Sequence, residues 1–316
     1  MKNLCLSPQA PFKSRCYAAI WGVDDSLFLF GGQGQDKNYY NDMWRFQGQQ
    51  WTQCLIQSQA PTARKGAATW LGHDGNLYIF GGIGYQDGVL DYLIDLWCFN
   101  IRAQTWVQLS HTDIMPMPRL ESQIWQDNWG DVYMYGGLGA SGSLADFWRF
   151  STHTMTWKTL PSGPAPCYGA VTWTCQNHLF LCGGIGQSGL WAFNPTAVQW
   201  QMLEAPPVAS YGSVGWTSAA QVHMWSGLAL QAPENIVCKQ EAWSYDIAHN
   251  AWSAFTPEWT ITPRYSAHTF AFQDKVVIFG GITEKGEYLN DLWLVQHDRQ
   301  QSQEPQKNMA TFQMNL

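Results

Sequence analysis

The sequence predicts an all-β fold built from a repeated unit of four strands. Three observations support this prediction: a short motif occurs six times and ends in two glycines in five of its copies, an aromatic residue precedes the first glycine position of each copy by ten or eleven residues, and tryptophans mark two further strands in five of the six units. The clearest copy of the motif is residues 77–82, LYIFGG. A period near 50 residues is typical of repeat folds, in which each unit buries its apolar faces against its neighbours. We therefore expect one closed domain.

The glycine motif supplies the second strand of each unit. Its first glycine stands at positions 31, 81, 136, 183 and 280, and Ser226 takes this place in the fifth copy. Apolar β-forming residues precede it each time. Glycine is needed where φ is positive or where another backbone comes too close for a Cβ atom. Each copy therefore predicts a buried strand that ends at such a point.

The first strand lies ahead of this motif and ends on an aromatic residue. Counting back six residues from that aromatic reaches arginine in four of the six copies. A small residue lies between the arginine position and the aromatic residue in each copy. Small side chains suit the crowded innermost strand of a radial sheet. The six positions reached are Arg15, Arg64, Arg119, Cys167, Ser210 and Arg264.

The third and fourth strands follow a variable loop after the glycines. The third opens with an acidic residue two positions before a tryptophan in five copies, and the fourth begins with a tryptophan in five copies. The acidic positions are Asp42, Asp95, Asp146, Glu241 and Asp291, with Gly189 in the fourth copy. Most of the 19 tryptophans fall at such repeat sites, which indicates packing between sheets.

These features resemble the kelch repeat. The residues that carry the resemblance are the double glycine after an apolar strand, the inner strand opened by Pro61-Thr62-Ala63-Arg64, and the spaced tryptophans, over roughly residues 2 to 295. The resemblance implies a six-bladed β-propeller of four-stranded antiparallel blades around a central channel. Blades would start near residues 15, 64, 119, 167, 210 and 264.

The two ends of the chain predict how the ring closes. No fourth-strand tryptophan follows Trp293, so we expect residues 2–8 to complete blade six and to remove sheet edges that invite aggregation. The propeller would then occupy residues 1–295. Residues 296–316 form a polar tail, in which alternation over residues 309–316 allows a short outer strand.

Composition limits the partners and the compartment. The net charge of −7 and the lack of a basic run argue against nucleic acid and anionic membranes. No apolar stretch is long enough to span a bilayer, and the start of the chain lacks a signal-peptide core, so a cytoplasmic location is expected. The eight cysteines lack CxxC spacing and indicate buried thiols, with neither a metal nor a cofactor expected.

One face of the predicted propeller collects the candidate site residues. In an antiparallel blade the start of strand one, the end of strand two and the start of strand three lie at the same end. By resemblance to kelch propellers, this face binds partners or substrates around the channel mouth. Candidate ligand-binding residues there are Arg15, Arg64, Arg119 and Arg264, which would favour an acidic peptide, a carboxylate or a phosphate.

A structural interpretation of the arginines is equally specific. The copies that lack arginine, the fourth and fifth, also lack the aspartate that opens strand three. This joint loss indicates that each arginine pairs with the aspartate of its own or the adjoining blade, which leaves little charge for a ligand.

Blades four and five depart from the repeat and so indicate a site, because a closed repeat tolerates exceptions mainly where function requires them. Tyrosines stand beside the missing arginines, and an off-pattern Trp259 lies in the connection to blade six. Each ring has packing as its alternative role. The aromatic and rim candidates are Tyr168, Tyr211, Tyr265, Trp259 and His111, to which Tyr39, Tyr40, Tyr85 and Tyr288 could add.

Catalytic candidates are few. Glu121 and His268 occupy inner-strand positions that hold small or apolar residues in most other copies, so either could move a proton in the channel or simply bond a water or a carbonyl. The sequence contains no GxSxG, P-loop or HExxH motif.

Two classes of function remain open. One is a protein that binds a protein or peptide partner through the loop-rich face, which is common among kelch propellers. The other is a small-molecule enzyme, such as an isomerase, epimerase or cyclase, with its pocket at the same channel mouth. An enclosed pocket at the mouth would favour the enzyme, and a broad open rim would favour the partner.

Overall fold

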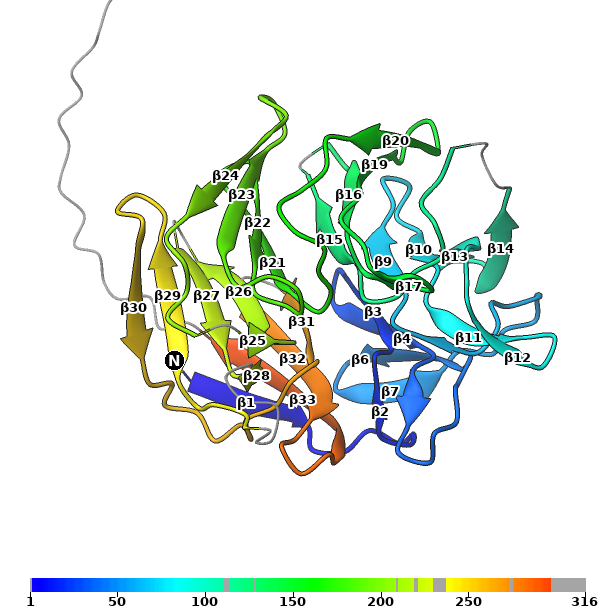
Figure 1. The fold of residues 1–316 in the computed structure, drawn as a ribbon. Helices are drawn as coiled ribbons and strands as arrows, with labels where there is room; N and C mark the ends of the chain where they lie inside the picture. The colour runs from blue at the N-terminus through cyan, green and yellow to red at the C-terminus, as the bar shows by residue number, and fades with distance from the viewer. Residues whose placement is uncertain are drawn as a thin grey trace, which may run out of the picture.

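The computed structural model describes residues 2–110, 114–127, 129–208, 210–218, 221–229, 237–272 and 275–296. In this part of the chain, strands form six four-stranded antiparallel sheets, the blades of a propeller (Figure 1). From inner to outer strand, blade one is β3 (Ala19–Val23), β4 (Ser26–Phe30), β6 (Met43–Gln47) and β7 (Gln50–Gln53), and blade two is β9 (Ala68–Leu71), β10 (Leu77–Phe80), β13 (Leu96–Asn100) and β14 (Thr105–Leu109). Blade three is β15 (Gln123–Gln126), β16 (Val132–Tyr135), β19 (Phe147–Ser151) and β20 (Thr156–Leu160), and blade four is β21 (Val171–Cys175), β22 (His178–Cys182), β23 (Leu190–Asn194) and β24 (Gln199–Leu203). Blade five is β26 (Val214–Ser218), β27 (Gln221–Trp225), β29 (Ala242–Asp246) and β30 (Ala251–Phe255), and blade six is β31 (His268–Phe272), β32 (Lys275–Ile282), β33 (Tyr288–Gln296) and β1 (Lys2–Ser7).

The first strands of the blades lie side by side around the centre. Each contacts the first strand of the next blade, and β31 of blade six contacts β3 of blade one. This arrangement explains the small residues predicted for the inner strand, because six strands converge there and leave no room for large side chains. The six-bladed, all-β fold predicted from the sequence is confirmed.

Blade six takes its outer strand from the start of the chain. Strand β1 pairs antiparallel with β33, with Leu4 opposite Leu294 and Cys5 opposite Trp293. The same sheet therefore contains residues from both ends of the propeller, as Figure 1 shows by the blue strand beside the orange ones. Without β1, the hydrogen-bonding groups of β33 would form an exposed sheet edge.

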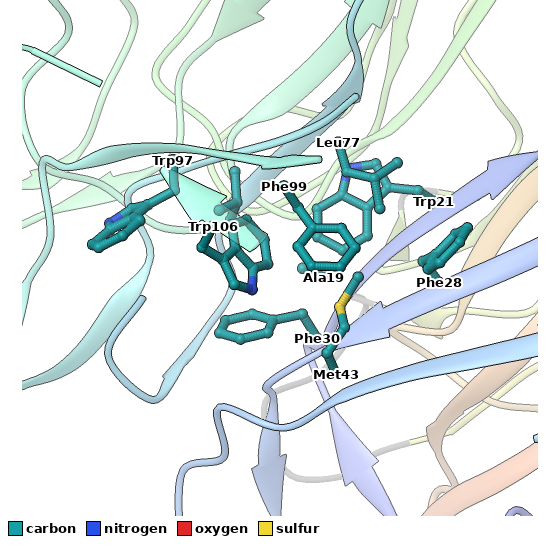
Figure 2. Packing of buried hydrophobic residues seen from close by; sticks show 10 residues of the cluster. Ala19, Trp21, Phe28, Phe30, Met43, Leu77, Trp97, Phe99 and Trp106 are labelled. Atoms are coloured by element: carbon teal, nitrogen blue, oxygen red, sulfur yellow. The ribbon is translucent and has the colours of Figure 1, made fainter. Parts of the chain in front are cut away.

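The apolar core lies between neighbouring blades. In the cluster between blades one and two, Trp21 and Phe28 from blade one pack against Leu77, Phe99 and Trp106 from blade two (Figure 2). The repeated tryptophans of the first and fourth strands are thus packing residues here, as predicted. Buried aromatic side chains of this size contribute a large share of the apolar area removed from water.

In blades one to five, the second glycine of the motif donates its N–H to a backbone carbonyl of the next blade. Gly81 has a φ of +67°, and a Cβ atom there would lie 2.9 Å from the carbonyl oxygen of Arg119 in the following blade. The next residue, Gly82, donates its N–H to that same carbonyl at 2.8 Å. Both reasons for glycine given by the sequence, positive φ and close approach, therefore apply at this one position.

Some sequence-based expectations fall outside the described residues. These are the polar tail, with its alternative outer strand at residues 309–316, and the rim candidate His111. None of the described residues forms a helix long and apolar enough to cross a bilayer. Five of the eight cysteines are buried, among them Cys182 in β22, as the sequence indicates.

Candidate functional site: the loop-rich face and the channel mouth

The loop-rich face is the end of the propeller where strand one starts, strand two ends and strand three starts. In blade two, Arg64 marks the start, Gly81 the end of strand two and Asp95 the start of strand three. The Arg64 guanidinium contacts both other residues: Nη1 donates to the Gly81 carbonyl at 3.0 Å and to Asp95 Oδ1 at 2.6 Å. The predicted convergence of these three points is therefore confirmed.

The Arg64 side chain is almost fully engaged within its own blade. Nη2 donates to Asp95 Oδ2 at 2.7 Å, and Nε donates to the Thr62 carbonyl at 3.0 Å. Together with the two Nη1 bonds, this uses four of the five N–H donors of a guanidinium. Trp97 Nε1 donates to Asp95 Oδ2 at 2.6 Å and holds the carboxylate in place.

The same pairing recurs in every blade that has arginine. In each, the guanidinium forms a bidentate pair with the aspartate that opens strand three. It also donates to the carbonyl of the first glycine and to the carbonyl of the residue two positions before the arginine. The other pairs are Arg15 with Asp42, Arg119 with Asp146 and Arg264 with Asp291. All four arginines are buried. The structure thus shows the pairing alternative, within one blade.

Two of the aspartates show the electrostatic consequence of the pairing. Burial acts to raise the pKa of Asp95 and of Asp146, but the hydrogen bonds and charges of Arg64 and Arg119 outweigh it and hold both values below the ordinary one. These carboxylates therefore stay ionised at neutral pH. The arginines contribute to blade structure, and a ligand on this face must be recognised mainly by other groups.

A ring of left-handed residues surrounds the channel mouth. Each blade contributes the residue two positions after the arginine site, with φ between +52° and +67°: Tyr17, Gly66, Glu121, Gly169, Gly212 and Ser266. Backbone bonds join neighbours in this ring, as in Glu121 N–H to the Gly66 carbonyl at 2.8 Å and Ser266 N–H to the Gly212 carbonyl at 2.8 Å. The three ring members that have side chains, Tyr17, Glu121 and Ser266, therefore lie at one mouth.

Three of these side chains, those of Tyr17, Glu121 and Ser266, form a polar cluster across that mouth together with Tyr211, the residue before Gly212. The Tyr211 hydroxyl donates to Glu121 Oε2 at 2.7 Å, and lies 2.9 Å from the Tyr17 hydroxyl. Ser266 Oγ donates to the Tyr17 hydroxyl at 3.3 Å. The cluster joins blades one, three, five and six. Lys65 of blade two lies with its Nζ 5.5 Å from the centre of the Tyr17 ring.

Burial governs the titration of this channel-mouth cluster. It raises the pKa of the Glu121 carboxyl, and it outweighs the hydrogen bond from Tyr211 and the charge of Lys65, which both lower that pKa. Burial, together with the Glu121 charge, also raises the pKa values of Tyr211 and Tyr17. The tyrosines are therefore neutral donors, and Glu121 is a carboxyl that holds a proton more tightly than an exposed one.

Tyr211 also stands at the centre of the predicted aromatic arc. Its ring centre lies 6.0 Å from that of Tyr168 and 6.2 Å from that of Tyr265. Room for the ring comes from Gly169, where any Cβ atom would collide with Tyr211 and where φ is +65°. The structure therefore brings together the tyrosines of blades four, five and six.

The hydrogen bonds of this cluster in the described chain include neither Trp259 nor His268. Trp259 packs edge-on against Trp225, at 5.0 Å between ring centres, and at a tilt against Trp216, at 5.8 Å, in the core between blades five and six. Its role in the structure is loop packing. His268 begins β31, and burial lowers its pKa to about 4, so its imidazole is neutral at pH 7. Its buried Nε2 has no hydrogen-bond partner among the described residues.

A hairpin projects from the loop-rich face at blade two. Strands β11 (Ile83–Gln86) and β12 (Val89–Tyr92) pair antiparallel, and β11 also pairs with β8 (Arg64–Lys65), so the hairpin extends the start of the inner strand (Figure 1). Its turn, Asp87-Gly88, has positive φ at both residues, as tight hairpins require. Tyr85 also packs edge-on against Tyr39 of blade one at 5.6 Å.

The remaining rim tyrosines support the blade structure. The Tyr40 ring lies 4.2 Å from the Arg15 guanidinium carbon, and its hydroxyl donates to Asp36 at 3.1 Å. Burial and a hydrogen bond with Cys16 raise the pKa of Tyr288. Both tyrosines are thus held by neighbours in blade one.

Three contributors to the mouth escaped the sequence-based reasoning: Tyr17, Lys65 and Ser266. A signal was present, because Tyr17 and Ser266 share with Glu121 the position two residues after an arginine. In the other three blades that position is glycine, so the non-glycine residues there are the exceptions that project toward the channel.

Comparisons with known proteins agree with this architecture. The structure is similar to one described as "Structure of YjhT", with a TM-score of 0.77 and 17% sequence identity, over 93% of this chain and 98% of that one. At this identity the likeness concerns the fold alone.

Curated proteins are similar over part of the chain. Kelch domain-containing protein 3 of Rattus norvegicus is 28% identical over 153 residues, which cover 45% of this chain and 39% of that protein. Host cell factor 1 of Homo sapiens is 27% identical over 181 residues, covering 50% of this chain and 9% of that protein. The chain thus spans less than half the length of these relatives. The model of the KLHDC2/KLHL20/DRC7 Kelch-repeats domain matches residues 4–184, more than half of the sequence, and the chain belongs to this kelch-repeat family.

Proposed function

We propose that this propeller binds a protein or peptide partner through its loop-rich face, with the β11–β12 hairpin as the principal contact. The observation that carries the proposal is the exposed apolar surface of the hairpin. Tyr85 and Leu90 are cross-strand neighbours and are 50% and 44% exposed, and Val89, next to Leu90 in β12 and on the opposite face of the hairpin, is 65% exposed. Exposed apolar side chains that cluster on one element are typical of protein-interaction sites.

Two further exposed apolar side chains lie in loops that follow the hairpin in sequence. Ile94 follows β12 and is exposed, and Met117, which precedes the start of strand one in blade three, is 63% exposed. Both belong to the loop-rich face, because they lie beside Asp95 and Arg119 in sequence. A hairpin held by three paired strands presents these side chains without a large loss of conformational entropy on binding. Such a surface suits a partner segment with apolar side chains.

The channel mouth also favours a partner over a small substrate. Glu121, Tyr211, Tyr17 and Ser266 bond to one another across the mouth. A small molecule that used Glu121 would have to enter this bonded cluster and share the carboxyl with Tyr211, whose hydroxyl donates to Oε2 at 2.7 Å. A partner that rests on the rim has no such requirement.

The test compares capture by three forms of the protein. The double variant Tyr85→Ser/Leu90→Ser removes the apolar pair, and Val107→Ser removes a 53% exposed valine from the outer strand β14 of the same blade. Wild type and the Val107 variant should retain the same polypeptide from a cell extract, and the double variant should lose it at an unchanged melting temperature. Equal retention by all three forms would refute the proposal.

One observation favours a second candidate function, a small-molecule enzyme of the isomerase, epimerase or cyclase class. Burial raises the pKa of Glu121, and carboxyls with raised pKa values are typical of general acids and bases. If the protein is such an enzyme, a compound in a metabolite extract should change on incubation with wild type and stay unchanged with Glu121→Gln. An extract that neither form alters would count against it.

A further inference from the structure

Blade five contains a small pocket at the place where four other blades hold their arginine side chain. The residues around it include Val208, Ser210, Ser226, Glu241 and Trp243. Ser210 occupies the arginine position of this blade, and Glu241 occupies the position of the paired aspartate. The pocket therefore lies at the position that the guanidinium occupies in the other four blades.

The acceptors that bind a guanidinium elsewhere are still present in this pocket. In blade two, Arg64 donates to the carbonyl two residues before it, to the first-glycine carbonyl and to the carboxylate that opens strand three. The residues at these three positions in blade five are Val208, Ser226 and Glu241, and all three line the pocket. The chain has thus kept the acceptors and lost the donor.

The Ser226 carbonyl can accept a further hydrogen bond. It already accepts one from Ser213 Oγ at 3.1 Å. Blade three shows that this bond and an arginine are compatible: the Gly136 carbonyl accepts from Ser122 Oγ at 3.2 Å and from Arg119 Nη1 at 2.9 Å. A carbonyl oxygen has two lone pairs, so the second place at Ser226 is open to a ligand.

Blade four also lacks the arginine, but there a side chain of the same blade donates to the carbonyl of the first glycine. The Gln187 amide donates to the Gly183 carbonyl at 3.0 Å, and its oxygen accepts from the Gly189 N–H at 3.1 Å. Gly189 also leaves no carboxylate at the start of strand three. Loss of the arginine therefore does not by itself create a binding pocket, and blade five differs by keeping its carboxylate.

We propose that the blade-five pocket binds the guanidinium group of an arginine side chain supplied by another molecule. Glu241 would accept a charge-assisted, bidentate pair, and the Val208 and Ser226 carbonyls would take the remaining N–H donors. Lys239 also lines the pocket and competes as a cation for Glu241, and no ion pair between the two is found in the described chain. This proposal is independent of the hairpin contact, since it concerns a different blade and a charged group.

The first experiment measures binding of N-acetyl-arginine amide to the full chain by titration calorimetry and by the indole NMR signals. We expect saturable binding, with no binding of N-acetyl-citrulline amide, which has the same length and no charge. Glu241→Gln should weaken binding at least about tenfold, because a hydrogen bond to a charged group is lost. Glu204→Gln, at an exposed carboxylate outside the pocket lining, should bind as wild type does.

A second set of variants refills or opens the pocket. Ser210→Arg combined with Glu241→Asp restores the arginine–aspartate pair of the other blades, and should abolish binding and raise the melting temperature. Lys239→Met removes the competing cation and should strengthen binding. Equal binding of the arginine and citrulline compounds, unchanged binding in Glu241→Gln, or binding of inorganic phosphate that depends on Lys239 would each overturn the proposal.

Discussion

The Tyr211 hydroxyl donates a 2.7 Å hydrogen bond to Glu121 Oε2 and so connects blade five to blade three across the channel mouth. The two residues are 90 positions apart in sequence, and both stand where most other blades have a different side chain. This contact ties non-adjacent blades together at the point where the inner strands begin. It also supplies the buried carboxyl with a donor.

Replacing Tyr211 with phenylalanine should therefore destabilise the propeller. The variant keeps the ring that packs between Tyr168 and Tyr265 but leaves the half-buried Glu121 without its donor, which costs about 1–3 kcal/mol. Urea unfolding of the two proteins measures this loss. Tyr17→Phe is the control, since it leaves the bond to Glu121 intact and should cost less; equal losses would show that this bond has no special role.

The stability of Glu121→Gln relative to wild type should depend on pH. The pKa of Glu121 in the folded state is raised above its unfolded value of about 4.3. The protonated carboxyl therefore stabilises the fold below about pH 4.3, and this stabilisation is lost as pH rises through the folded-state pKa. The glutamine variant has no such loss. Melting temperatures from pH 4 to pH 8 should shift progressively in favour of the variant, whereas two parallel curves would contradict the raised pKa.

Arg64→Ala should destabilise the protein strongly. Removing one partner of a buried, bidentate pair leaves Asp95 with an uncompensated charge, at a cost of about 3–5 kcal/mol. Lys13→Ala removes an exposed ion pair with Asp36 and should change stability little. Chemical denaturation of both variants checks the contrast. A stable Arg64 variant with altered ligand binding would restore the view that this arginine serves a ligand.

Deleting residues 1–8 should lower the melting temperature, because β33 would lose all its hydrogen bonds to β1 and become a sheet edge. Leu4→Ser is the matched control: its side chain is exposed on β1, so the strand pairing should survive. Thermal unfolding of the three proteins separates the role of the backbone pairing from that of one side chain. An unchanged transition after the deletion would contradict this account of blade six.

Sequence alone predicted the parts of the structure that repeat. The joint loss of arginine and aspartate in two copies predicted the pairs now seen at Arg64–Asp95 and its equivalents. Repetition provides an internal comparison, so a requirement met in several blades is visible within one chain. The same comparison identified Tyr211 and Glu121 as exceptions.

Features that occur once were harder to predict. The Tyr211–Glu121 contact crosses the ring, and no repeat spacing indicates which blades face each other closely enough to bond. Trp259 is off-pattern, yet its ring fills a gap beside Trp225, a residue that is itself unique to blade five. The exposed hairpin likewise depends on the length of one loop, whose fold became clear only through its pairing with β8.

The central claim, that a partner rests on the hairpin of blade two, is tested most directly by site-specific photo-crosslinking. A benzophenone side chain placed at position 90, on the hairpin, should form a covalent adduct with the retained polypeptide, and the same group at position 107, on β14, should not. Crosslinks at position 107 and none at position 90, or equal crosslinks at both, would contradict the account.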